Sequence, residues 1–170
     1  MIRIPDKGGA IPGRADQKPS RAAKGRRMKL VKHLLDAKGR HIISIAPDAS
    51  VFDAIKLMAD KSIGSLLVMD DDENMLGIVT ERDYARKVIV KGRSSRETRV
   101  DEIMTADVMT ASGDHRVDQC MELMTERRIR HLPVVEDDRV IGLISIGDLV
   151  QAIIADQQAE IEHLGQYISG

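Results

Sequence analysis

The chain has 170 residues, a length that suits one domain or two small domains packed together. Hydrophobic residues make up 42% of it but aromatic ones only 2%, so the core must consist of Ile, Leu, Val and Met. The sequence shows no apolar run near the ~20 residues that span a bilayer, no apolar core of a secretory signal, and one cysteine, Cys120. These features argue against a membrane-spanning or disulfide-stabilised secreted protein and predict a soluble, cytoplasmic one.

The net charge of −1 conceals two regions of opposite sign. Residues 1–40 hold 12 Lys/Arg and 3 Asp/Glu, whereas residues 41–170 hold 14 and 24. Residues 1–27 are rich in Pro, Gly and cations, which predicts a disordered basic leader. The first hypothesis is that the leader has no function. Three alternatives stay open: it binds nucleic acid or an acidic partner, it is an organelle transit segment, or the natural start is Met28. The acidic remainder makes nucleic acid an improbable main partner.

Patterns after the leader predict a helix followed by a β-α-β-β-α unit. The helix at 28–39 has an apolar stripe and ends at a glycine. A second helix places Val51, Ala54, Ile55 and Met58 on one face. The continuous apolar run "SLLVM" predicts a strand buried on both sides. The predicted elements of the unit are a strand at 41–45, a helix at 51–64, strands at 65–69 and 75–80, and a helix at 81–92.

The second half of the chain repeats this order at an offset of 66 residues, and of 65 after the hairpin turn. Val51 and Met58 recur as Val117 and Met124, and Cys120 falls on the buried face of the second repeat's helix. Units of about 60 residues bury their cores poorly alone, so we expect an α+β fold of two repeats packed with pseudo-two-fold symmetry. The predicted elements are strands at 108–110, 131–135 and 140–145, and helices at 117–129 and 146–168.

One motif occurs at the same place in both repeats: "GIVTERD" at 77–83 and "GLISIGD" at 142–148. Each puts a hydroxyl and, three residues later, a carboxylate where a strand turns into a helix. A capping box alone explains such a pair. Its repetition favours a second interpretation, because unpaired helix N–H groups attract phosphate and an aspartate can accept from two ribose hydroxyls.

The two repeats, the two motifs and "RIRHLPVV" at 128–135 together resemble a tandem pair of CBS domains, the Bateman module, over residues ~30–160. The chain is similar to stand-alone bacterial and plant-organelle proteins made of the pair alone, which carry a similar "GRSS" linker. The resemblance implies an adenosine nucleotide (AMP, ADP, ATP, NAD or S-adenosylmethionine) in clefts between the repeats. It also implies aspartate on the ribose, a hydroxyl near the phosphates, and a disk-like homodimer.

Three segments complete the candidate site. The resemblance implies that "SIGSL" at 62–66 and "IRHLP" at 129–133 form the walls of the pocket around the adenine and ribose. Plain core packing explains their apolar side chains equally well. The cationic linker at 91–105 either donates to phosphates or is a connector in which Thr98 and Asp101 cap a short helix. "SIGD" lacks the cation that "TERD" has, which would weaken phosphate contacts in the second pocket. The predicted ligand-binding residues are Ser44, Ile63, Gly64, Ser65, Leu66, Thr80, Arg82, Asp83, Arg93, Ser94, Ser95, Thr110, Arg130, His131, Leu132, Pro133, Ser145 and Asp148, with Arg99 as a further linker donor.

The remaining candidate residues do not show the sequence patterns of a catalytic or metal-binding site. Cys120 has no His on its helix face, the five His lack metal-ligand spacing, and "DDDEN" and "EDD" are hairpin turns rather than calcium loops. We therefore predict no catalytic residue, no metal and no catalytic cofactor. The predicted domains are a leader at 1–27, a first repeat with its N-terminal helix and linker at 28–97, and a second repeat at 98–170.

The leading hypothesis for function is a non-enzymatic regulator that senses an adenine nucleotide and modulates an unidentified partner protein. A dimeric scaffold with unused pockets is the main alternative. An enzyme that hydrolyses the nucleotide is a third, weakened by the absence of a paired base and nucleophile. Saturable nucleotide binding separates the first two.

Overall fold

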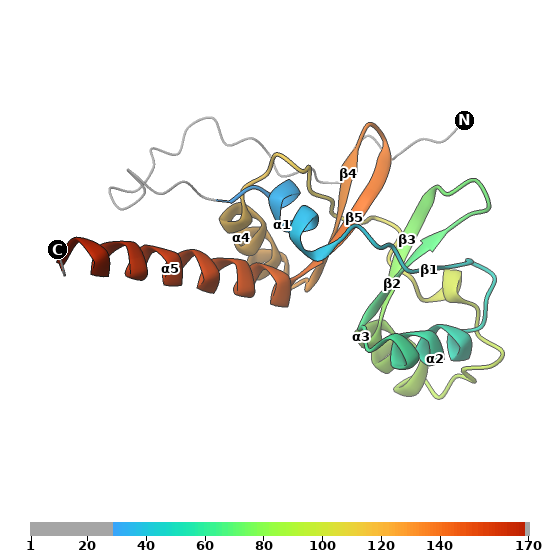
Figure 1. The fold of residues 1–170 in the computed structure, drawn as a ribbon. Coiled ribbons are helices and arrows are strands. Elements are labelled where there is room, and N and C mark those ends of the chain that lie inside the picture. The colour runs from blue at the N-terminus through green and yellow to red at the C-terminus, as the bar shows by residue number, and fades with distance from the viewer. Residues whose placement is uncertain (1–28, 169–170) are drawn as a thin grey trace. The chain divides into compact units, whose positions relative to one another are not determined.

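The computed structural model describes residues 29–168, so the predicted leader lies outside the described residues. The chain divides into two compact units (Figure 1). The first comprises residues 41–109 with 138–140, and the second comprises residues 29–40, 110–137 and 141–168. Each unit mixes helices with a small sheet, which confirms the predicted α+β class and the two repeats. Their mutual arrangement, including the pseudo-two-fold, remains a prediction.

The first unit is built on a three-stranded sheet in the order β1-β2-β3. Its central strand β2 runs parallel to β1 and antiparallel to β3. Leu66, Leu67 and Val68 on β2 are fully buried, as the unbroken apolar run predicted. The strands are β1 (Ser44–Ile45), β2 (Ser65–Met69) and β3 (Met75–Thr80), so β1 is shorter than predicted.

Helix α2 (Val51–Lys61) covers the core of this sheet. Its N-terminus is capped by Ser50, whose hydroxyl accepts from the Asp53 N–H at 3.1 Å. The predicted apolar face is confirmed, because Val51, Ala54 and Met58 are buried and join the side chains of β2 and β3 in one cluster. The helix thereby fixes the end of β3, where the first doubled motif lies.

The helix after β3 has a different form from the one predicted. Only Glu81–Tyr84 is α-helical (α3), and the chain continues as a π-helix, η2 (Ala85–Ile89). The predicted glycine stop is present, since Gly92 has a φ of +64° and its N–H bonds to the Ile89 carbonyl. A short 3₁₀ helix, η3 (Val100–Glu102), follows the linker.

The second unit contains α4 (Val117–Arg127), the two-stranded sheet β4-β5 and the long helix α5 (Ile146–Ile168). Strands β4 (His131–Glu136) and β5 (Arg139–Ser145) cover the predicted ranges. Val117, Cys120 and Met124 are buried, which confirms the second predicted helix face. The predicted strand at 108–110 is wrong. Only Ala111 makes an isolated bridge, parallel to Val134, before the chain turns at residues 113–114.

Helix α1 (Val31–Lys38) precedes the first repeat in sequence but packs within the second unit. The Val31 N–H bonds to the His115 carbonyl and the Lys32 N–H to the Gly113 carbonyl, both at 2.9 Å. Val31, Leu34 and Leu35 are buried. The predicted helix and its glycine end are thus present, and its contacts join it to elements far along the chain. The predicted domain limits at 28, 97 and 98 remain predictions.

Within residues 29–168, no helix combines the length and apolarity that a membrane crossing requires. The two hairpin turns behave as turns. The Asp70 carboxylate accepts from the backbone N–H groups of Asp72 and Asn74 at 3.0 and 2.8 Å, and Asp137 and Asp138 both have positive φ. Turn formation therefore explains these acidic residues, as predicted.

Candidate functional site

The first motif forms a complete capping box at the junction of β3 and α3. The Asp83 N–H donates to the Thr80 hydroxyl oxygen at 3.2 Å. In return, the Asp83 Oδ2 accepts from the Thr80 N–H at 3.0 Å and from the Thr80 hydroxyl at 2.9 Å. The structural part of the sequence interpretation is therefore confirmed. Because this box fixes the carboxylate rotamer, Asp83 is held at the strand end rather than extended into solvent.

Lys87 adds a counter-ion to this carboxylate. Its ammonium lies 2.8 Å from Asp83 Oδ1 and also donates to the Ile103 carbonyl at 2.6 Å. A carboxylate offers about four acceptor positions, and three of them on Asp83 are filled by these contacts. A ribose that donates two hydroxyls to Asp83 must therefore displace the lysine or turn the Thr80 hydroxyl away.

The second motif forms the equivalent junction between β5 and α5. The Ser145 N–H donates to Asp148 Oδ2 at 2.7 Å, and the Asp148 N–H donates to the Ser145 hydroxyl oxygen at 3.2 Å. The counter-ion here is Lys38 of α1, whose ammonium lies 2.5 Å from the same Oδ2 and donates to the Leu143 carbonyl at 2.9 Å. Both junctions thus combine a hydroxyl, a carboxylate and a lysine ammonium.

The environment of the second junction shifts two pKa values. Burial opposes ionisation of Asp148, but the hydrogen bonds from Lys38 and the Ser145 N–H outweigh it and keep the pKa of that carboxyl below its usual range. Burial lowers the pKa of His131, and the nearby charges of Arg130 and Lys38 lower it further, against the opposing effect of Asp148. At neutral pH the junction therefore holds an ionised carboxylate beside a neutral imidazole.

Equivalent backbone hydrogen bonds join the two predicted wall segments, 62–66 and 129–133, to the junctions. The Glu81 N–H donates to the Gly64 carbonyl at 3.1 Å, and the Ile146 N–H donates to the Arg130 carbonyl at 2.9 Å. Ser65 is also the strand partner of Thr80. The repeats therefore place equivalent residues of "SIGSL" and "IRHLP" directly beside the doubled motif.

Burial separates the predicted wall residues, and the other predicted ligand-binding residues Ser44, Arg82 and Thr110, into two groups. Ser65, Leu66, Leu132 and Pro133 are buried, and Leu66 belongs to the apolar core cluster of the first unit. The other residues of this set are partly or fully exposed. These are Ser44, Ile63, Gly64, Thr110, Arg130 and His131, together with Arg82, which lies beside the first junction and has contacts of its own.

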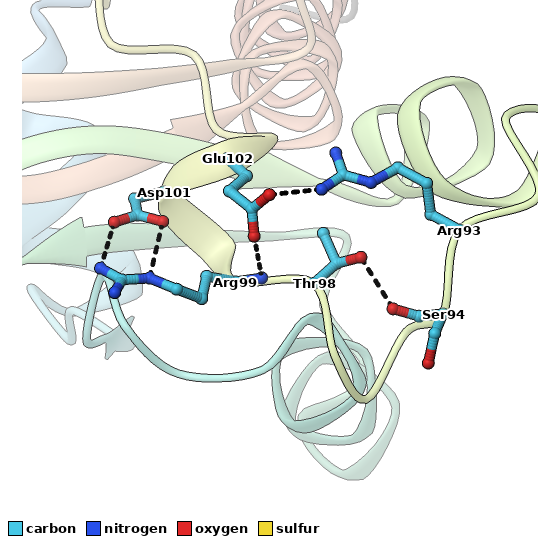
Figure 2. Close-up of polar contacts among 6 residues, drawn as sticks. All are labelled: Arg93, Ser94, Thr98, Arg99, Asp101 and Glu102. Carbon is cyan, nitrogen blue, oxygen red and sulfur yellow. Dashed lines mark hydrogen bonds and ion pairs between the residues drawn. The ribbon is translucent and has the colours of Figure 1, made fainter.

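The linker is held by its own ion pairs rather than left open (Figure 2). Arg93 pairs with Glu102 at 2.5 Å, and Arg99 forms two bonds to Asp101 at 3.1 and 2.5 Å. Arg93 and Arg99 were predicted to donate to the phosphates of a ligand. To do so, each must release the carboxylate with which it is now paired.

Thr98 does not cap the short helix, and that detail of the connector interpretation is wrong. Its hydroxyl donates to the Ser94 carbonyl at 2.7 Å, while the Glu102 carboxylate accepts from the Arg99 N–H (Figure 2). The reason lies in α2, whose first N–H groups, those of Val51 and Phe52, bond to linker carbonyls and draw Thr98 inside the unit. Ser95, whose carbonyl accepts from Phe52, also lies 3.2 Å from the Tyr84 hydroxyl.

Cys120 is fully buried on α4, and burial raises the pKa of its thiol to about 12, with a smaller contribution from Asp118. Its predicted role in core packing is confirmed, because a thiol that stays protonated in the interior is a poor nucleophile.

Sequence reasoning missed the two lysines. The spacing of Asp83 and Lys87, four residues apart on one helix, was a signal that pointed to their pairing. Lys38 and Asp148 lie 110 residues apart, and no local pattern joins them.

The model of the CBS domain family matches residues 35–89 and 100–155, which together include both junctions. Among curated proteins, the chain is similar to the CBS domain-containing protein CBSX3, mitochondrial, of Arabidopsis thaliana. The two are 44% identical over 127 residues, which is 72% of this chain and 62% of that protein. The chain thus spans less than two thirds of the length of this relative.

Two solved structures share the fold. One is a putative signal-transduction protein with CBS domains from Burkholderia ambifaria, at 55% identity and a TM-score of 0.73, covering 76% of this chain and 96% of that one. The other is the CBS domain pair of protein MJ0100 in complex with 5′-methylthioadenosine and S-adenosyl-L-methionine. It has 29% identity and a TM-score of 0.66, and the match covers 75% of this chain and 98% of that one.

Proposed function

Because the chain belongs to the CBS domain family and carries two copies of the domain, we propose that it is a regulatory module that binds an adenosine nucleotide and passes the bound state to a partner protein. The observation that carries the proposal is the doubled junction. Each copy holds a carboxylate able to accept from ribose hydroxyls next to an ammonium able to meet a phosphate.

This donor set suits a ribose and a phosphate, and one neighbour supports adenosine as the nucleoside. The MJ0100 pair was solved with two compounds that share an adenosine group and differ beyond it. An aspartate on the ribose suits every member of that class, and the lysine adds affinity for those that carry phosphate. AMP, ADP, ATP, NAD and S-adenosylmethionine are therefore the ligands to test, with the predicted wall and linker residues as their proposed contacts.

Regulation needs two states of the module that bind the ligand with different affinity. We propose that the chain does this as a homodimer and without chemistry of its own. The name of the Burkholderia neighbour, a putative signal-transduction protein, supports the regulatory role. A cytoplasmic location remains the expectation from sequence, although the Arabidopsis relative is named mitochondrial. The partner protein is unidentified.

The alternative is a scaffold that never binds a nucleotide. One observation favours it: both aspartates already have an ammonium and a backbone N–H as partners, so each junction is electrostatically satisfied within its own unit. A ligand binds to either aspartate only if its contacts are more favourable than these internal ones.

Calorimetric titration of the full chain decides between the two. We expect saturable binding of at least one of AMP, ATP, NAD and S-adenosylmethionine, and much weaker binding of GMP, which keeps the ribose and phosphate but changes the base. Adenosine compared with AMP then measures the phosphate contribution. If none of the adenosine compounds binds at millimolar concentration, the regulatory proposal fails and the scaffold remains.

A further inference from the structure

Helix α5 carries an apolar stripe that the described residues of its own unit leave uncovered. Seven large apolar side chains are exposed within the described residues, and four of them lie on this helix: Val150, Ile154, Ile161 and Leu164. The helix is anchored near its start by the fully buried Leu149, whereas every residue from 157 to 166 is exposed. Figure 1 shows α5 running well beyond α4, the helix on which it packs.

The four side chains follow the heptad pattern of a coiled coil. Their spacings of 4, 7 and 3 residues place Ile154 and Ile161 at the first core position, and Val150 and Leu164 at the second. Gln157 occupies the one remaining core position between them. A β-branched residue at the first position favours two parallel helices, and Leu164 at the second strengthens that preference.

We propose that residues 150–168 pair with the same segment of a second copy of this chain as a short parallel coiled coil. A heptad stripe is complementary to itself, as the isologous interface of a two-fold dimer requires. Asp156 and Glu162 lie on the outer positions, and Glu160, which flanks the seam, faces Gly165 of the other copy in a parallel pair, so no like charges meet across it. Residues 146–168 contain no Lys or Arg, which is unlike a helix that lies on a membrane surface.

Gln157 selects the parallel orientation. In a parallel pair the two Gln157 side chains meet in one layer, where each amide can donate to the other. In an antiparallel pair each amide faces Ile154 or Ile161 of the other helix and loses its hydrogen bonds on burial. A single polar residue in the core is a known device for fixing register.

The inference rests on the proposed homodimer but not on nucleotide binding. The segment is about 28 Å long at 1.5 Å per residue, and helices of this length are marginal on their own. The coil therefore adds to whatever contacts the rest of the chain makes, and aligns the two copies in parallel.

Cysteine cross-linking of the full chain tests the pairing. Gln157→Cys should form a disulfide-linked dimer under mild oxidation at least tenfold faster than Ala159→Cys, which lies on the opposite side of the helix. The wild type, with only the buried Cys120, gives the background rate. Equal rates for the two variants, or no cross-link above background, would overturn the parallel coil.

Sedimentation equilibrium gives the second readout. Ile161→Glu with Leu164→Glu should raise the dimer dissociation constant at least tenfold, while Ala159→Glu with Gln166→Glu, an equal charge change on the outer side, should leave it unchanged. A dimer that resists the first pair keeps the homodimer and overturns the coil. A monomeric wild type overturns both, and so does a monomer whose stripe instead binds vesicles of phosphatidylcholine and phosphatidylserine; nucleotide titration remains a separate test.

Discussion

The two junctions show how one motif is completed in two ways. At the first, the carboxylate of Asp83 takes its ammonium from Lys87, one turn further along the same helix. At the second, Asp148 takes it from Lys38 on a helix that comes before the first repeat. A repeat can therefore copy the local hydrogen bonds faithfully while the charge that balances them comes from a different part of the chain.

The glycine that opens each motif repeats this contrast. A Cβ added at Gly77 would lie 2.7 Å from the Thr105 carbonyl oxygen, because the segment after the linker bridges to β3 there. A Cβ at Gly142 would lie 2.7 Å from Leu35 Cδ2 of α1. Both glycines permit close approach of a neighbouring segment, but backbone and the Met104 side chain fill the space in the first unit, whereas only a side chain fills it in the second.

The largest expected effect is on the helix that only the second unit uses. Leu35→Ala should destabilise the protein by about 2–5 kcal/mol, because Leu35 is fully buried and its loss leaves a cavity. His33→Ala, on the exposed side of α1, should cost about 0.5 kcal/mol or less. Urea denaturation measures both. Equal, small losses would mean that α1 is not part of the second unit's core.

The next largest loss of stability is expected when the two motif glycines are replaced by alanine. Gly77→Ala should cost about 2–3 kcal/mol, the upper part of the range for overpacking, since the backbone carbonyl of Thr105 cannot turn away. Gly142→Ala should cost about 1 kcal/mol, because the end of the Leu35 side chain can shift. Thermal and urea unfolding of the two variants compare them directly. The reverse order would contradict the difference drawn between the two units.

The sequence predicted what depends on local pattern. The two repeats, the buried strand at Leu66–Val68, the face that contains Cys120, and both capping boxes follow from periodicity and spacing. These features depend on residues within a turn or a strand of each other, where physical rules are strong.

What it missed depends on contacts distant in sequence. The helix at 31–38 was found, but nothing in its pattern says that it packs on the second repeat or that Lys38 meets Asp148. The strand at 108–110 failed because the chain there makes a single bridge. Thr98 was assigned as a cap from spacing alone, whereas the N–H groups of α2 compete for that part of the linker.

Replacing either lysine should change ligand binding at its own junction and not at the other. Lys87→Met and Lys38→Met should each cost about 0.5–1 kcal/mol of stability, because the ammonium groups are partly exposed. Each should also weaken ATP relative to adenosine, at its own junction alone, by about tenfold, or about 1.4 kcal/mol. Two-site calorimetry checks this. A change that appears at both junctions from one variant would contradict the separate counter-ions.

The smallest effect concerns pH, and it belongs to the second unit. The pKa of His131 is lowered in the folded state, so the unfolded chain binds the proton first as the pH falls below about 6.5. Stability should therefore be constant above pH 7 and fall from there towards pH 5. His131→Gln should flatten part of this slope. His115, whose pKa is also lowered by burial, accounts for another part, so His115→Gln is the necessary companion.

The titration of two aspartate variants tests the central claim most directly. Asp83→Ala and Asp148→Ala should each weaken an adenosine nucleotide at its own junction by about 30- to 1000-fold, or 2–4 kcal/mol, since the ribose hydroxyls lose their acceptor. Asp53→Ala removes a similar carboxylate from the cap of α2 and should cost about 0.5–2 kcal/mol of stability while leaving affinity unchanged. If all three variants bind AMP, ATP and S-adenosylmethionine as the wild type does and differ only in melting temperature, the doubled motif is a pair of helix caps and the account is contradicted.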